Sequence, residues 1–223
     1  VVTYGFSSQA DFRAESVKIE GLKSSFRIIR GDEELGEVTL PAPGMHNVLN
    51  ALAATVVAIE LDMPFETVKK GFEGFSGVRR RFQLKGQTRG IVVIDDYGHH
   101  PSEVRATLAA ARAAFGNPVS GGKRIIAVFQ PHRFSRTQDL YRQFIDAFDD
   151  ADVLILTDIY PAGEKPIPGI SGKLIYREVK QGGHKNVIFV PDRRDVVTHL
   201  RGLVKDNDVL ITLGAGDIYK VGE

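Results

Sequence analysis

The sequence predicts an α/β protein built from two different regions. From Ile91 onward, short apolar segments alternate with amphipathic helical segments, which is typical of a mainly parallel, doubly wound, Rossmann-like sheet. Residues 11–40 instead alternate apolar and polar side chains, which predicts antiparallel strands with one solvated face. Two helical segments follow these strands, so the first region should combine antiparallel strands with two helices.

In the first region, the alternation is clearest over residues 26–30, and Gly31-Asp32 provides a turn signal after them. Residues 41–44, Pro-Ala-Pro-Gly, end the strands because proline cannot donate to a sheet ladder. The helices expected next span residues 45–61 and 64–75.

In the second region, apolar segments four to six residues long predict buried strands, and the segments between them predict the helices that cross over the sheet. The expected strands are 91–95, 124–129, 152–157, 186–190 and 208–213. The expected helices are 101–115, 135–148, 171–181 and 192–204. The change of pattern lies near residues 77–90, and we expect domains over residues 1–82 and 83–223.

The composition excludes several classes of protein. Of the 223 residues, 43% are hydrophobic and 26% charged, the balance of a globular protein. The net charge of +1 and the lack of a basic stripe give no reason to expect a nucleic-acid partner. There is no cysteine, so disulfides and thiolate metal sites are excluded. No apolar run approaches the roughly 18 residues of a membrane span, so we expect no membrane partner and a cytoplasmic location.

The chain opens at Val1 inside a strand-like run, with no initiating methionine. This start suggests either a processed terminus or the later part of a longer protein, and we favour the second.

The most informative segment is residues 95–104, Asp-Asp-Tyr-Gly-His-His-Pro-Ser-Glu-Val. It follows an apolar strand, turns at Gly98, and enters a helix with Pro101 near the first helical position. Ligands of open α/β sheets bind at this edge, and a helix N-terminus there favours anions. Neighbouring strand residues point to opposite faces, so Asp95 and Asp96 are not expected to hold a metal together. His100 is expected to be structural, near the helix cap.

A second motif opens the first expected helix, where His46, Asn47 and Asn50 share one face near its N-terminus. The rest of this helix is apolar nearly all round, so it should be buried. An asparagine amide can read the donor and acceptor edge of adenine. The alternative is a helix cap together with a buried asparagine bonded to the backbone, because a buried amide needs a partner.

A third motif, Phe-Gln-Pro-His-Arg-Phe-Ser-Arg-Thr, ends the next strand, with Ser135 as the expected N-cap of the following helix. Arg133 and Arg136 suit bidentate capture of a carboxylate or phosphate. The alternative is a solvated loop whose arginines pair with Asp139 or Asp146.

Together these motifs resemble the Mur ligases of peptidoglycan synthesis, and within them the branch that joins L-alanine to UDP-N-acetylmuramate. The branch that attaches a recycled tripeptide resembles the chain less, because its pattern lacks the equivalent of Tyr97 and the His-Arg-Phe-x-Arg run. The matching stretches follow the order of the family over nearly the whole chain. They are residues 44–54, 79–82, 95–104, 129–137, 160–164 and 213–218.

The resemblance implies ATP-driven amide formation, in which the muramate carboxylate becomes an acyl phosphate that the amine of L-alanine attacks. The implied partners are ATP, UDP-N-acetylmuramate, L-alanine and the missing N-terminal portion of the same protein. A phosphate-binding loop of the form Gly-x-x-x-x-Gly-Lys-Ser/Thr is absent, and residues 116–124 fail as a candidate because they precede a strand. The family's phosphate cradle and Mg²⁺ ligands would therefore lie upstream of Val1.

The resemblance also implies roles for individual residues. Adenine would be bound by His46, Asn47 and Asn50, and the ribose by Asp96. Arg81 would bind the phosphates and take part in catalysis, Tyr97 would lie beside nucleotide and substrate, and His99 would face the reacting centre. The alanine carboxylate or the acyl intermediate would be bound by Arg133 and Arg136. Arg79 and Arg80 are expected to be only a solvated basic turn.

Two alternatives from other classes remain. One is an autonomous nucleotide- or amino-acid-binding module without catalysis. The other is a nicotinamide oxidoreductase, which is disfavoured because residues 214–216 lack the third glycine of the dinucleotide fingerprint.

Overall fold

The computed structural model describes residues 1–223, which divide into two compact units. The first unit is built on residues 1–77 and the second on residues 78–223 apart from 113–115. This division falls shortly before the domain boundary that the sequence analysis placed after residue 82.

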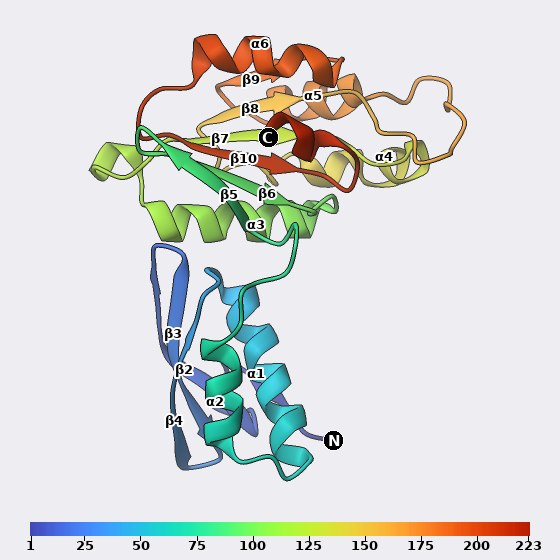
Figure 1. The fold of residues 1–223 in the computed structure, drawn as a ribbon. Helices are drawn as coiled ribbons and strands as arrows, with labels where there is room; N and C mark the ends of the chain where they lie inside the picture. Colours follow the sequence, from blue (N-terminus) through green and yellow to red (C-terminus); the bar gives the residue numbers. More distant parts are fainter. The chain divides into compact units, whose positions relative to one another are not determined.

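The first unit is a four-stranded sheet with two helices (Figure 1). Its strands lie in the order β1 (Tyr4–Gly5), β2 (Phe12–Glu20), β3 (Lys23–Arg30) and β4 (Glu33–Leu40). The last three are antiparallel, as the alternation predicts, while β1 is parallel to β2.

Helices α1 (Met45–Glu60) and α2 (Phe65–Glu73) follow the strands of the first unit. They cover one face of its sheet in Figure 1. The core beneath them holds apolar side chains from the strands and from α1, among them Phe12, Phe26, Ile28, Val38, Val48 and Leu52.

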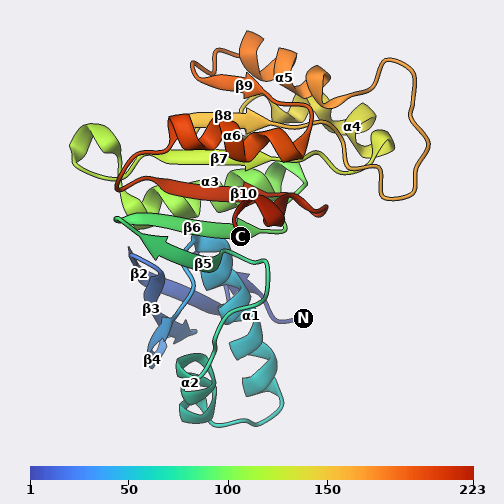
Figure 2. The same cartoon turned by 45° about the horizontal axis from the view of Figure 1, so that its top comes forward.

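The second unit contains a six-stranded sheet in the order β5-β6-β10-β7-β8-β9. Figure 2 shows the strands beside one another in this order. The strands are β5 (Gln83–Thr88), β6 (Ile91–Asp96), β7 (Ile125–Phe129), β8 (Val153–Leu156), β9 (Val187–Phe189) and β10 (Val209–Leu213). All neighbours are parallel except β5, which runs antiparallel to β6. The final strand of the chain, β10, therefore lies inside the sheet.

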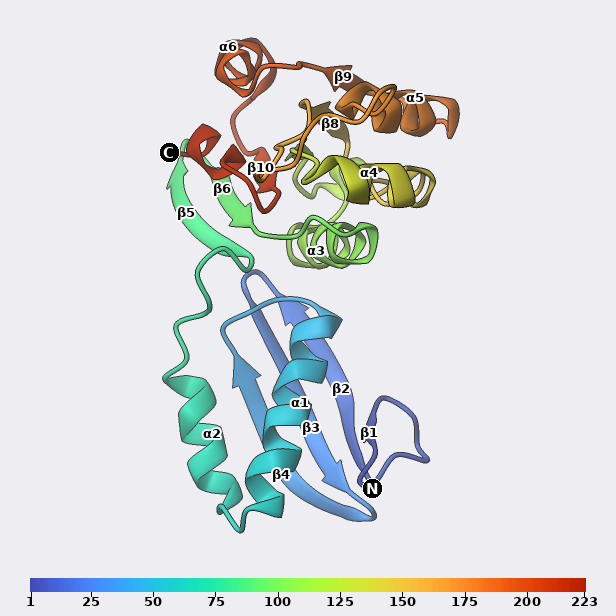
Figure 3. The same ribbon diagram turned by 90° about the vertical axis from the view of Figure 1, so that its right-hand side faces the viewer.

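Helices cover both faces of this second sheet, so the doubly wound α/β prediction is confirmed. Figure 3 shows α3 (Pro101–Phe115), α4 (Phe134–Leu140) and α5 (Gly172–Gln181) on one face and α6 (Arg193–Leu203) on the other. Val196 and Leu200 of α6 pack against Ile126 and Val128 of β7 in one apolar cluster. No helix in residues 1–223 has the length and apolar character needed to cross a bilayer.

The prediction of one helix over residues 135–148 was wrong in detail. The α-helix α4 ends at Leu140, and a 3₁₀ segment, Tyr141–Phe144, follows it. The buried rings of Phe144 and Phe148 both pack on Phe129 of β7, with centroids 5.2 and 5.3 Å away. The spacing of these rings mimics a continuous helix in the sequence, while tertiary packing sets the backbone.

Candidate active site

Polar side chains gather at the carboxyl edge of the second sheet, where parallel strands end together. Asp96 closes β6, Gln130 follows β7 and Thr157 follows β8, while Gly214 follows β10. The sequence analysis placed four site residues after β6 and β7, namely Tyr97, His99, Arg133 and Arg136. All four lie on the loops that continue from this edge or on the helix that follows.

Arg80 forms the most extensive side-chain network at this edge. Its guanidinium donates to the buried Asp95 carboxylate at 3.0 Å and to the carbonyl oxygens of Gly214 and Gly216 at 2.6 and 3.3 Å. The guanidinium carbon also lies 5.0 Å from the centroid of the Tyr97 ring. The expectation that Arg80 is a solvated turn residue was therefore wrong, because a run of three arginines carries no signal of which one turns inward.

The Asp96 carboxylate is buried and bonded to the backbone. Its two oxygens accept from Phe82 N at 2.8 Å and from Gly98 N at 2.7 Å. Burial raises the pKa of Asp96, and these backbone donors oppose the rise. Asp96 thus fixes the turn that leads into the first motif, and its contact with a ribose stays a prediction. No group of three or more histidine or acidic residues in residues 1–223 is arranged to hold a metal ion.

The start of α3 is stabilised by a reciprocal cap. His100 is the N-cap, its side chain accepts from Ser102 N, and Glu103 Oε2 accepts from the backbone N of His99 and of His100. The expectation that His100 is structural is confirmed. This cap also fixes the backbone of His99, the residue just before it.

The surroundings of the His99 imidazole favour its neutral form. Burial, and then the positive charges of Arg136 and Arg81, lower the pKa of His99, while the Tyr97 carbonyl and Glu103 partly oppose this. Its Nδ1 lies 3.0 Å from the Tyr97 carbonyl oxygen, which can only accept. We therefore assign the proton to Nδ1, which leaves Nε2 with a free lone pair.

Four rings form a row along the edge: Tyr97, His99, His132 and Tyr160. Successive ring centroids are 5.4, 5.5 and 5.7 Å apart, and the last pair is stacked with an interplanar angle of 9°. Burial and the neighbouring charges of His99, Arg136 and Arg133 lower the pKa of His132 to about 4. The sequence analysis assigned no role to His132 or Tyr160, although both lie inside the matched stretches.

Arg133 and Arg136 form no ion pair, so the alternative that they pair with Asp139 or Asp146 was wrong. Asp146 pairs with Arg105 instead. Arg133 is exposed, and Arg136 is half-buried with its Nη1 3.4 Å from His132 Nδ1. Neither guanidinium has a carboxylate within ion-pair distance, although the charge of Arg133 contributes to the lowered pKa of Glu164.

The N-cap of α4 is Arg133 rather than Ser135, at a backbone φ of 71°. Ser135 instead donates its backbone N–H and its hydroxyl to the Glu164 carboxylate, which comes from the loop between β8 and α5. A partner distant in sequence therefore replaces the local cap that the sequence analysis expected.

Arg81 lies next to the first motif, and half of its side chain is exposed. Its Nη1 lies 3.6 Å from Glu103 Oε1, and its guanidinium carbon lies 5.7 Å from the Tyr97 ring centroid. A solvated guanidinium near a helix N-terminus suits an anionic ligand.

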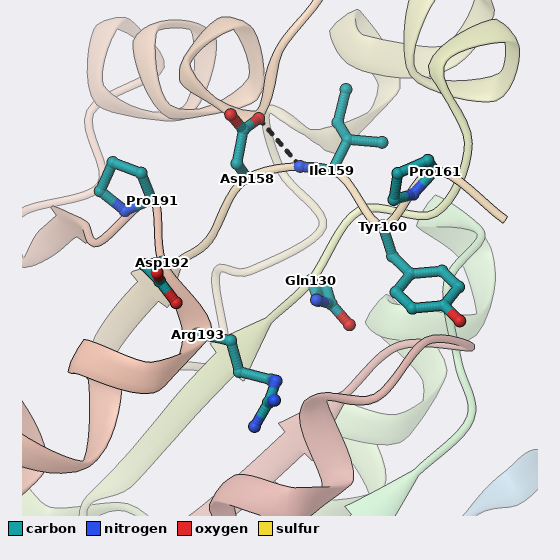
Figure 4. A pocket seen from close by; sticks show the side chains of 8 residues that line it. All are labelled: Gln130, Asp158, Ile159, Tyr160, Pro161, Pro191, Asp192 and Arg193. Atoms are coloured by element: carbon teal, nitrogen blue, oxygen red, sulfur yellow. Dashed lines mark hydrogen bonds between the residues drawn. The ribbon is translucent and has the colours of Figure 1, made fainter. Parts of the chain in front are cut away.

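A pocket of about 360 Å³ opens at the ends of β7, β8 and β9. Figure 4 shows Gln130 between Arg193 and Tyr160. Gln130 Nε2 donates to Asp217 at 3.2 Å, and Arg193 pairs with the other oxygen of Asp217 at 3.0 Å. These contacts hold the turn that follows β10 in place.

The polar residues of the second motif lie in the first unit, at the start of α1. Asn47 Nδ2 donates to the Pro43 carbonyl oxygen at 2.7 Å, which is the backbone-bonded alternative for this residue. Asn50 is exposed, so the expectation of a buried helix face does not hold there, and His46 is half-buried. Gly44 is the N-cap and provides no side-chain cap. The contacts of these three residues with adenine stay predictions.

The chain belongs to the Mur ligase family. Residues 80–216 match the Mur ligase, glutamate ligase domain, and residues 1–58 match the Mur ligase middle domain. Among curated proteins, it is 52% identical over 221 residues to the UDP-N-acetylmuramate–L-alanine ligase of Geobacter sp. (strain M21), covering 99% of this chain and 47% of that relative. The chain thus spans about half the length of the curated relatives it matches.

Two solved structures agree with this fold. The UDP-N-acetylmuramate–alanine ligase of Thermotoga maritima matches with a TM-score of 0.82 and 30% identity, over 99% of this chain and 46% of that one. A murein peptide ligase from Psychrobacter arcticus 273-4 matches with a TM-score of 0.61 and 20% identity, over 98% of this chain and 44% of that one, which is a likeness of fold alone.

Proposed function

We propose that the chain is the carboxyl-terminal part of an ATP-dependent ligase that joins L-alanine to UDP-N-acetylmuramate in the synthesis of the peptidoglycan precursor. The observation that carries the proposal is the pair of unpaired arginines beside neutral His99 at one sheet edge. The identity of about half along the whole chain with a ligase of that name supports this reaction over others in the family.

The geometry suits each requirement of amide formation. Arg133 and Arg136 would bind the carboxylate of L-alanine, because charge-assisted bonds to carboxylates favour planar guanidiniums. The Nε2 lone pair of His99 would accept a proton from the alanine ammonium, since a neutral imidazole is a competent base near pH 7. The freed amine would attack the acyl phosphate, whose phosphate then leaves. Tyr97 would form one wall of this site.

The nucleotide roles are part of the same proposal. Asn47 and Asn50 would bind adenine with His46 beside them, Asp96 would accept from the ribose, and Arg81 would stabilise the phosphates. ATP supplies the phosphoryl group, and the phosphate loop and Mg²⁺ ligands would belong to a portion of the polypeptide that precedes Val1. We place the reaction in the cytoplasm, where its substrate ATP is available.

Single substitutions in the full-length ligase test the carboxylate clamp. Loss of one charge-assisted hydrogen bond costs about 1.5–3 kcal/mol, so Arg133→Ala or Arg136→Ala should raise the KM for L-alanine at least about tenfold. The KM for UDP-N-acetylmuramate should stay nearly constant. Arg177→Ala, on the exposed surface of α5, is the matched control. An unchanged KM for L-alanine in both variants would contradict the clamp.

The substrate that the full-length protein uses distinguishes the proposed function from its alternatives. A tripeptide-recycling ligase would form product from a free tripeptide in preference to L-alanine, and a binding module would form none. Steady-state assays of the full-length protein with both amines distinguish the three cases.

A further inference from the structure

We propose that Glu164 is a positioning residue that holds the arginine-bearing segment, residues 131–137, in the geometry that binds the substrate carboxylate. The inference rests on the proposed function, because it takes Arg133 and Arg136 as the carboxylate clamp. Glu164 belongs to the loop of residues 157–171 between β8 and α5, which lies outside both motifs that supply the proposed catalytic groups.

The first support is the missing cap of α4. This helix has only seven residues and no cap from its own N-cap side chain. The Glu164 carboxylate takes that place, since Oε1 accepts from Ser135 Oγ at 2.7 Å and Oε2 accepts from Ser135 N at 3.1 Å. These hydrogen bonds lower the pKa of Glu164, so the group is a carboxylate at neutral pH. A helix end needs such acceptors for its first N–H groups.

The second support is a backbone connection from the same loop. Arg133 N donates to the Tyr160 carbonyl oxygen at 2.9 Å, and Tyr160 N donates to the Pro131 carbonyl oxygen at 2.8 Å. The Tyr160 ring stacks on His132. The loop therefore binds the segment on both sides of the Arg133 side chain. The Tyr160 backbone bonds to Pro131 and to the Arg133 backbone N–H, and Glu164 bonds to Ser135.

The third support is the backbone of Arg133 itself. Its φ of 71° lies in the left-handed region, which residues other than glycine rarely adopt. Such a conformation persists where surrounding contacts hold it, and the contacts of Tyr160 and Glu164 enclose it on both sides. Because both Glu164 oxygens already accept from Ser135, Glu164 acts through the segment and not on the substrate.

The test uses the full-length ligase and separates KM from kcat. We expect Glu164→Ala to raise the KM for L-alanine about tenfold while kcat changes less than about threefold, because the clamp is displaced and the base is not. Glu164→Gln keeps one acceptor and should fall between the wild type and Glu164→Ala. The double variant Glu164→Ala/Ser135→Ala should raise KM no further than Glu164→Ala, since both act through one contact. Glu178→Gln on α5 is the charge-matched control.

Thermal unfolding of each variant separates this role from general stability. A KM for L-alanine that is unchanged in Glu164→Ala, while Arg133→Ala and Arg136→Ala raise it, would overturn the inference and leave the proposed function standing. The inference would also be overturned if Glu164→Ala and Glu164→Gln had the same effect, with a lower kcat, a higher KM and a lower melting temperature in both. That pattern indicates a purely structural role. Unchanged KM in the arginine variants would contradict the clamp and the inference together.

Discussion

At the scale of single residues, the Asp95 carboxylate is almost fully buried and depends on Arg80 and Thr212 for its partners. Removing one member of a buried ion pair leaves the other charge uncompensated. We expect Arg80→Ala to lower the free energy of unfolding by about 3 kcal/mol, measured by urea denaturation. Arg79→Ala removes an exposed arginine next to it and should change stability by less than about 0.5 kcal/mol. Equal effects of the two substitutions would contradict the role assigned to Arg80.

His132 should make stability depend on pH. Its pKa of about 4 in the folded chain lies below the ordinary value of 6.5, so the unfolded state binds more protons between these values. Stability contributed by neutral His132 is therefore present above about pH 6.5 and is lost as pH falls toward 4. His132→Asn should flatten this loss, whereas His199→Gln on the surface should not. Ring proton shifts in NMR that titrate near pH 6.5 for His132 would contradict the prediction.

The sequence places Arg133 and Arg136 at the carboxyl edge of the sheet, but it does not show which contacts hold them there. Arg133 and Arg136 were proposed because two guanidiniums three residues apart at the carboxyl end of a strand suit capture of a carboxylate or phosphate. Their support by Glu164 was not predicted, since it comes from 29 residues further along the chain and no local pattern announces it. Asn47 shows the opposite case, because its bond to the Pro43 carbonyl is local and was weighed as the alternative.

At the scale of elements, β5 was not predicted because its six residues are mostly exposed and polar, with no apolar alternation. The sequence signal for this strand lies in the turn that follows it. Arg89 and Gly90 connect β5 to β6 as a two-residue hairpin, with φ of 49° and 74°. The buried strands β6 to β10 were predicted to within a residue or two, because continuous apolar segments of that length fit little else.

Gly90 should therefore be essential to this hairpin. A Cβ at Gly90 would clash with the Asn207 side chain, and the backbone there has a conformation that L side chains rarely adopt. We expect Gly90→Ala to lower the free energy of unfolding by about 1–2 kcal/mol, measured by denaturant titration. Arg89→Gly should be tolerated, because glycine adopts the positive φ of that position without strain. Equal destabilisation by the two changes would exclude the turn described here.

At the scale of the whole molecule, the two units contain adenine- and carboxylate-binding candidates but no phosphate loop. We expect residues 1–223 alone to show no ATP hydrolysis above background in a coupled phosphate assay. The reason is that phosphoryl transfer depends on a cradle and metal ligands that these residues do not provide. The full-length ligase is the positive control. Turnover by the purified chain that survives further purification would contradict the prediction.

The position of β10 has a consequence for biosynthesis. This strand is synthesised after the other strands of its sheet, yet it must insert between β6 and β7. Until it arrives, the apolar flanks of both strands lack their ladder partner, a state that invites aggregation. A nascent second unit that lacks β10 therefore exposes the edges of β6 and β7, and a truncation before Val209 would remove the strand that joins them.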